Sequence, residues 1–323
     1  IKYGVDNGFQ VFAISWANPG LADADWGVDR YVAAVMEAIP VVKAITRSQD
    51  LNLFALCSGA MMMSAMAACL KARGDESIHS MTIGVCMLEM QRGDMEVSAF
   101  ASPAIFERVK KRSKKAGVLR GHELALSMLW LRPQELIWGN AVNNYLLGNE
   151  PPEFDLLFWN NDWTNLPAQL HCDVLDMFAT ACLLTPGAMA VDGTALDLQA
   201  VDCDKFIFGG LTDHITPWGA CYRSALAFGG NKEFVLSSSG HMQTMLNAPG
   251  KKQASFFVNK ALPEHADDWL EDADLKQGSW WPHWRDWLGA RSSSRKVAPK
   301  RLGNKAYPAG VSAPGSYVLQ QAD

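Results

Sequence analysis

Leu51-Asn52-Leu53-Phe54-Ala55-Leu56-Cys57-Ser58-Gly59-Ala60 is a short apolar run that ends at a cysteine and continues into a segment rich in methionine and alanine. The run is typical of a buried strand, and the segment after it is typical of a helix. A strand, a sharp turn and a helix in this order form a nucleophile elbow, which exposes the residue at the turn above the end of a sheet. Cys57 occupies that position. We expect its small neighbours Ala55 and Gly59 to make room for the strained backbone.

Cys57 is therefore a candidate nucleophile. The helix is expected to begin near Ala60, so the positive end of its dipole would favour the reactive thiolate form of Cys57. The alternative interpretation is a buried apolar cysteine, because most free cysteines are of that kind. The spacing of small residues centres on Cys57 and not on Ser58. The backbone N–H of Ser58 is then the candidate oxyanion donor.

The composition indicates a globular protein. The 323 residues suffice for one large α/β domain with an insertion or for two domains. A formal net charge of −5 argues against a general nucleic-acid binder. The seven scattered cysteines show no spacing typical of a disulfide framework or a metal site, which indicates a reducing, cytoplasmic setting. No apolar run reaches about 18 residues, so no membrane span is expected.

Alternating strand and helix patterns predict a mainly parallel sheet with helices on both faces. The β-rich run Gln10–Trp16 precedes Asn18-Pro19-Gly20 and is predicted to be a buried strand followed by a turn. Apolar residues at helical spacing predict a helix over residues 28–45, which Pro40 should kink or shorten. Further strands are predicted over residues 51–56, 80–88, 205–208 and 233–236.

The regular alternation stops between residues 91 and 195, a region that we predict to be a cap inserted into the sheet domain. The catalytic core would then be discontinuous, with residues 1–90 and 196–290. A tail over residues 291–323 is rich in Ser, Lys, Pro and Gly and is expected to run over the surface.

Four tryptophans recur at helical spacing before this tail, which is typical of a helix packed on the core. A polymer-binding face is the alternative. The four tryptophans are Trp280, Trp281, Trp284 and Trp287.

Two further side chains follow predicted strands and complete a possible triad with Cys57. Asp213 comes after the strand over 205–208, and His241 comes after the strand over 233–236. The order nucleophile, acid, histidine is that of α/β-hydrolases, and the ends of parallel strands are where open α/β sheets place their sites. In such a triad a thiol attacks an acyl carbon, the imidazole takes the thiol proton, and the carboxylate orients the imidazole.

Three more residues are candidates for a supporting role or for the substrate pocket. His214 adjoins Asp213 and is more readily a structural hydrogen-bonding residue. Trp218 ends the same loop. Gln243, two residues after His241, should lie near an acyl pocket. The alternative is that Gln243 takes part in ordinary packing and does not line a substrate pocket.

Several motifs together resemble the catalytic region of polyhydroxyalkanoate synthases, from Phe12 almost to the end of the chain. Two more resemble the branch of that family that handles medium-chain substrates. The first group is Ile14-Ser15-Trp16-Ala17-Asn18-Pro19, Leu131-Arg132-Pro133-Gln134-Glu135-Leu136-Ile137-Trp138, Asn143-Asn144-Tyr145-Leu146-Leu147-Gly148, Phe158-Trp159-Asn160-Asn161-Asp162, Asp213-His214-Ile215-Thr216-Pro217-Trp218 and Ser239-Gly240-His241. The second group is Leu147-Gly148-Asn149-Glu150-Pro151-Pro152 and Arg301-Leu302-Gly303-Asn304-Lys305-Ala306-Tyr307.

The resemblance implies an α/β-hydrolase fold with a cap and a specific reaction. A (R)-3-hydroxyacyl group would move from coenzyme A to Cys57, and a growing polyester chain would be extended with release of coenzyme A. Cys57 would be the acylated nucleophile, His241 the general base and Asp213 its partner. The coenzyme A thioester is the substrate, so no cofactor is expected. The resemblance also implies a homodimer in the cytoplasm, associated with the surface of polyester granules.

The sequence leaves two rival functions open. A thioesterase or polyester depolymerase would arise if water reached acylated Cys57, although cysteine in place of serine disfavours it. A non-catalytic, granule-associated homologue is the second rival, and retention of all three triad residues argues against it. The chain begins at Ile1 without a methionine, so we expect a fragment of a longer protein. The resemblance implies that an upstream strand carries a second oxyanion donor.

Overall fold

The computed structural model describes residues 1–90, 102–130, 133–150, 162–251 and 253–320. These residues form two compact units. Unit 1 consists of residues 1–13, 28–98 and 176–310, and unit 2 consists of residues 14–27, 99–175 and 311–323. Parts of three motifs quoted above lie outside the described residues, namely Leu131-Arg132, Pro151-Pro152 and Phe158–Asn161. The predicted boundaries of the cap and the tail stay predictions.

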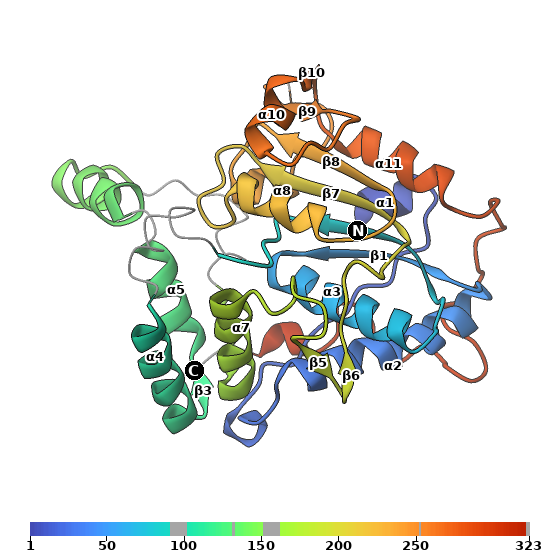
Figure 1. Ribbon diagram of the computed structural model, residues 1–323, viewed down its shortest axis with the longest axis horizontal. Coiled ribbons are helices and arrows are strands. Elements are labelled where there is room, and N and C mark those ends of the chain that lie inside the picture. The colour runs from blue at the N-terminus through green and yellow to red at the C-terminus, as the bar shows by residue number, and fades with distance from the viewer. Residues whose placement is uncertain (91–101, 131–132, 151–161, 252, 321–323) are drawn as a thin grey trace. The chain divides into compact units, whose positions relative to one another are not determined.

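A six-stranded sheet forms the centre of unit 1 (Figure 1). Its first four strands run parallel to one another, and each of the last two pairs antiparallel with the strand before it, at one edge of the sheet. This arrangement confirms the predicted mainly parallel sheet. In spatial order the strands are β1 (Leu51–Leu56), β2 (Ile78–Gly84), β7 (Asp204–Gly210), β8 (Lys232–Ser237), β9 (Ser255–Val258) and β10 (Asp274–Gln277).

Helices cover both faces of this sheet. Figure 1 shows α3 (Cys57–Ala72) and α8 (Trp218–Leu226) on one face and α11 (Trp281–Ala290) on the other. The helix α2 (Val28–Thr46) packs on α3 and continues through Pro40. The remaining elements of unit 1 are α1 (Lys2–Asp6), α9 (His241–Met245), α10 (Ala266–Glu271) and the two-stranded ribbon of β5 (Ala190–Val191) and β6 (Thr194–Ala195).

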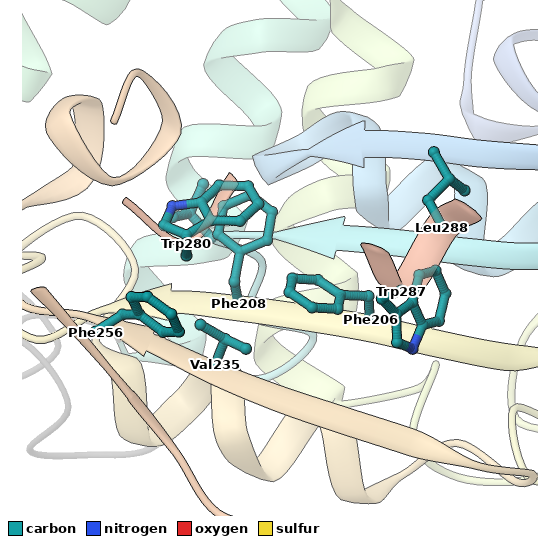
Figure 2. Packing of buried hydrophobic residues seen from close by; sticks show 8 residues of the cluster. Phe206, Phe208, Val235, Phe256, Trp280, Trp287 and Leu288 are labelled. Atoms are coloured by element: carbon teal, nitrogen blue, oxygen red, sulfur yellow. The ribbon is translucent and has the colours of Figure 1, made fainter. Parts of the chain in front are cut away.

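The face of the sheet under α11 carries an aromatic core (Figure 2). The ring of Phe208 lies 4.2 Å from that of Trp280, and the ring of Phe206 lies 5.5 Å from that of Trp287. Trp281 and Trp284 pack against the same cluster. Alternate residues of a strand point to opposite faces of the sheet. Val235 of β8 belongs to this core, so its neighbour Phe234 points to the other face, where its ring lies edge-on to that of Trp269. The structure therefore confirms that the tryptophan cluster marks a helix packed on the core.

The predicted strand over Gln10–Trp16 is wrong. These residues have no regular structure, and the side chains of Val11, Phe12, Ile14 and Trp16 are between 39% and 50% exposed. A β-rich composition describes a fit to a pleated, half-buried surface and becomes a strand only with a partner. Within the described residues β1 pairs with β2 alone, and Gln10–Trp16 pairs with neither.

Unit 2 is mainly helical. A hydrogen bond of 2.7 Å between Ser113 Oγ and His171 Nδ1 joins two of its helices, and burial lowers the pKa of His171. Its elements are η1 (Leu21–Asp23), α4 (Pro103–Ala116), β3 (Val118–Leu119), α5 (Gly121–Leu129), the π-helices η3 (Gln134–Trp138) and η4 (Ala141–Leu146), β4 (Leu166–Pro167), most of α7 (Ala168–Thr180) and η5 (Tyr317–Leu319). Across the part of the chain described here, no helix has the length and apolar character needed to span a membrane.

Candidate active site

The turn between β1 and α3 has the backbone of a nucleophile elbow. Strand β1 ends at Leu56, and Cys57 adopts a φ of 50°. A positive φ in a non-glycine residue is uncommon and is concentrated at functional sites. The helix begins at Cys57 itself, so the expected start near Ala60 is wrong. The chain needs only the left-handed conformation of Cys57 to pass from strand to helix, and no linking residues follow.

The close packing just before this turn involves a residue that sequence reasoning missed. A Cβ atom added at Gly59 would meet no described atom within 4 Å, apart from its own helix backbone and chain neighbours, so the surrounding packing does not require a glycine there. A Cβ added at Gly84 would lie 2.6 Å from Cδ2 of Leu56 and closer still to the ring of Phe208. Gly84, on the neighbouring strand, thus leaves room for the side chains of Leu56 and Phe208 beside the end of β1. No pattern near Cys57 points to it.

Asp213 and His241 lie together at the ends of adjacent strands. Asp213 follows β7, and His241 opens α9 after β8. His241 Nδ1 lies 2.7 Å from Asp213 Oδ2, and both side chains are buried. The strands β1, β7 and β8 are parallel, so their carboxyl ends share one edge of the sheet with Cys57.

Four hydrogen bonds fix the Asp213 carboxylate. Oδ1 accepts from the backbone N–H groups of Ile215 at 2.8 Å and Thr216 at 2.9 Å. Oδ2 accepts from the Thr216 hydroxyl at 2.8 Å and from His241. Sequence reasoning did not single out Thr216. The signal for it was local, since an aspartate in a loop often accepts from backbone N–H groups two and three positions later, as in an Asx turn, and the residue three positions after Asp213 carries a hydroxyl.

The surroundings of Asp213 and His241 favour the charged form of each side chain. Burial alone would raise the pKa of Asp213, but hydrogen bonds from His241 and Thr216 and the charge of His241 hold it below its usual value. Burial alone would lower the pKa of His241, but hydrogen bonds with Asp213 and with Cys57, together with their charges, raise it to about 9. At neutral pH, His241 is therefore held as an imidazolium ion that can stabilise an anion at Cys57.

Two other cysteines near this network differ from Cys57. Burial raises the pKa of Cys86 and of Cys221, so both thiols stay protonated at neutral pH. Cys221 Sγ donates to the carbonyl oxygen of Thr216 at 3.5 Å. Cys57 is partly exposed. Among these three thiols, Cys57 alone combines access with a histidine partner.

The remaining predicted site residues take different positions. The N–H of Ser58 lies in the first turn of α3, where backbone N–H groups have no acceptor within the helix. His214 and Trp218 are half-buried, and Gln243 is exposed on α9. The oxyanion role and the pocket roles stay predictions. Within the described ranges, no group of three or more His, Cys, Asp or Glu side chains could hold a metal ion.

Comparisons with known proteins agree with this geometry. A family model described as the alpha/beta hydrolase fold matches residues 1–248. Poly(3-hydroxyalkanoate) polymerase 1 of Ectopseudomonas oleovorans is 46% identical over 320 residues, which cover 99% of this chain and 57% of the relative. Poly(3-hydroxyalkanoate) polymerase 2 of the same organism is 44% identical over 320 residues, which again cover 99% of this chain and 57% of the relative. Poly(3-hydroxyalkanoate) polymerase subunit PhaC of Cupriavidus necator is 36% identical over 100% of this chain and 56% of its own. The chain thus spans somewhat more than half the length of the curated relatives it matches.

Proposed function

Because the chain belongs to the α/β-hydrolase fold family, we propose that it carries the catalytic core of a poly(3-hydroxyalkanoate) polymerase, which joins (R)-3-hydroxyacyl groups from coenzyme A into polyester. One observation carries this proposal. Cys57 has a strained elbow backbone and lies close enough to His241 to raise the pKa of its imidazole, and His241 Nδ1 lies 2.7 Å from Asp213 Oδ2. The names of the relatives supply the substrate class, and a thiol nucleophile suits a thioester substrate.

In the first half of the proposed reaction, the Cys57 thiolate attacks the thioester carbonyl carbon. The N–H of Ser58 stabilises the oxyanion, the bond to the coenzyme A sulfur breaks, and the leaving sulfur takes the proton from His241. The exchange of one thioester for another changes the free energy little. The acyl group therefore stays activated on Cys57.

In the second half, a hydroxyl group attacks the acylated Cys57. His241 takes the hydroxyl proton, an ester bond forms, and the Cys57 thiolate leaves. Asp213 stabilises the imidazolium in both halves without becoming protonated. A hydroxyl of the growing chain gives polyester, whereas water would give free hydroxy acid.

The wider assignment follows from the same proposal. We propose a core of residues 1–90 and 196–290, a cap of residues 91–195 that excludes water from acylated Cys57, and a surface tail of residues 291–323. The thioester supplies its own activation, so the chemistry needs no cofactor. A homodimer at the surface of polyester granules in the cytoplasm, and a preference for medium-chain substrates, belong to this proposal.

Release of coenzyme A from 3-hydroxyacyl-coenzyme A substrates of several chain lengths tests the proposal. The native full-length protein should release coenzyme A and form polymer, Cys57→Ala should do neither, and Cys182→Ala should behave as the parent. Cys182 is a suitable control because it is also partly exposed. Free hydroxy acid without polymer would mean a thioesterase. No release at any chain length would favour the non-catalytic homologue.

A further inference from the structure

Thr216 connects two members of the triad through its own atoms. Its side chain is buried, and its hydroxyl oxygen lies 2.8 Å from Asp213 Oδ2 and 3.2 Å from His241 Nδ1. Its backbone N–H reaches the other carboxylate oxygen of Asp213 at 2.9 Å. Thr216 therefore supplies two of the four hydrogen bonds that the Asp213 carboxylate accepts, and it also contacts the imidazole.

The positions of the protons in this network follow from the groups involved. A hydroxyl has one proton to donate, and an ionised carboxylate only accepts. The Thr216 proton therefore points to Asp213, and an oxygen lone pair is left facing His241. The Nδ1–H of His241 then lies between two acceptors, Asp213 Oδ2 and Thr216 Oγ1. This arrangement requires the proton at Nδ1, and it leaves Nε2 as the nitrogen that exchanges a proton with Cys57.

We propose that Thr216 is a positioning residue of the triad, whose hydroxyl locks the Asp213 carboxylate and serves as the second acceptor for His241 Nδ1–H. Its effect on polymer synthesis rests on the function proposed above. Its effect on the state of His241 and Cys57 rests on the geometry alone.

The backbone of Thr216 is held in place by two hydrogen bonds. The carbonyl oxygen of Thr216 accepts from the Cys221 thiol of α8, and the backbone N–H of Thr216 donates to Asp213. The backbone around Thr216 is therefore fixed independently of the hydroxyl. A change of the side chain alone can remove the hydroxyl while these two contacts keep the loop in place.

Three variants separate the hydroxyl from the shape of the side chain. Thr216→Val keeps the branched shape and loses the hydroxyl, Thr216→Ser keeps the hydroxyl, and Thr216→Ala is the matched partner of the serine variant. Loss of a hydrogen bond to a charged group should lower kcat for coenzyme A release about ten-fold or more in Thr216→Val and leave KM nearly unchanged. Thr216→Ser should stay within about three-fold of the parent.

The second measurement does not depend on polymer synthesis. The rate of alkylation of Cys57 by iodoacetamide, mapped by peptide mass spectrometry, is followed from pH 5 to pH 10. An imidazolium that loses one acceptor is less stable, so the midpoint of this profile should rise by roughly half a unit to one unit in Thr216→Val. Cys86 and Cys221 stay protonated over most of this range, and the carboxylate of Asp213 is ionised throughout, so the shift reports on the interacting pair of Cys57 and His241.

The outcomes are distinct. A Thr216→Val profile and kcat equal to those of the parent would overturn the proposal, as would a serine variant as impaired as the valine one. If Thr216→Val does not fold by circular dichroism, the serine and alanine variants carry the same comparison. If the parent releases no coenzyme A, the proposed function fails, and the alkylation profile still decides the role of Thr216.

Discussion

Replacement of Gly84 by alanine should weaken both the fold and the elbow. The added methyl would lie 2.6 Å from Leu56 Cδ2 and closer to the Phe208 ring. Phe208 cannot retreat freely, because it is fully buried with its ring 4.2 Å from that of Trp280. Overpacking of this kind costs about 1–3 kcal/mol in the free energy of unfolding. Leu56 directly precedes Cys57, so its displacement should also reduce coenzyme A release by about 10-fold or more.

The matched control is Gly59→Ala. The site is open, and a helix gains up to about 1 kcal/mol when alanine replaces glycine, so this variant should be at least as stable as the parent. Urea unfolding measures both variants. The double variant Gly84→Ala with Phe208→Leu should lose less stability than the sum of the two single changes, because leucine makes room for the methyl. Equal stability of Gly84→Ala and Gly59→Ala, or simple additivity in the double variant, would refute the steric explanation.

Two further predictions concern buried charges. The pKa of His241 rises from about 6.5 in the unfolded chain to about 9 in the fold. Protonated His241 therefore contributes on the order of 3 kcal/mol to the free energy of unfolding below pH 6.5, and this contribution is lost as the pH rises through 9. Urea unfolding across this range should show that loss in the parent, whereas an equal slope in His241→Gln would contradict it. Lys205 is fully buried, and its amine donates to the carbonyl oxygens of Val201, Cys203 and Gly229. Lys205→Met should lower the free energy of unfolding by about 3 kcal/mol, because it leaves these acceptors unpaired. The exposed control Lys276→Met should lower it by less than about 0.5 kcal/mol, and equal losses in the two variants would reject this explanation.

The elements that sequence analysis predicted correctly are those whose signals are local. The run over Leu51–Leu56 has the length and apolar character of a buried strand, and it directly precedes a cysteine. Asp213 and His241 each follow a similar run. Once a parallel sheet is assumed, the ends of these strands share one edge, so the approach of Asp213 to His241 follows from topology.

The features that sequence analysis missed depend on atoms from distant parts of the chain. Gly84 matters because of Leu56 and Phe208, which belong to two other strands. The run over Gln10–Trp16 has the composition of a strand, but a strand also needs a partner, which composition does not reveal. The antiparallel strands β9 and β10 are only four residues each, too short for a period to stand out. Thr216 had a local signal, but its contact with His241 crosses from one loop to another.

The aromatic core under the sheet also acts on the site. Cys57 has a φ of 50°, and Val85 at the end of the next strand has a φ of 44°; each such residue costs about 1–3 kcal/mol and persists only where the surroundings hold it. Leu56 and Cys57 pack against the cluster that contains Val85 and Trp280. The indole N–H of Trp280 also donates to the carbonyl oxygen of Thr244 at 2.9 Å, in the short helix that His241 begins. The same aromatic cluster therefore packs against the elbow and, through the indole of Trp280, holds the helix that His241 begins. The separation of nucleophile and base thus depends on core packing as well as on the triad.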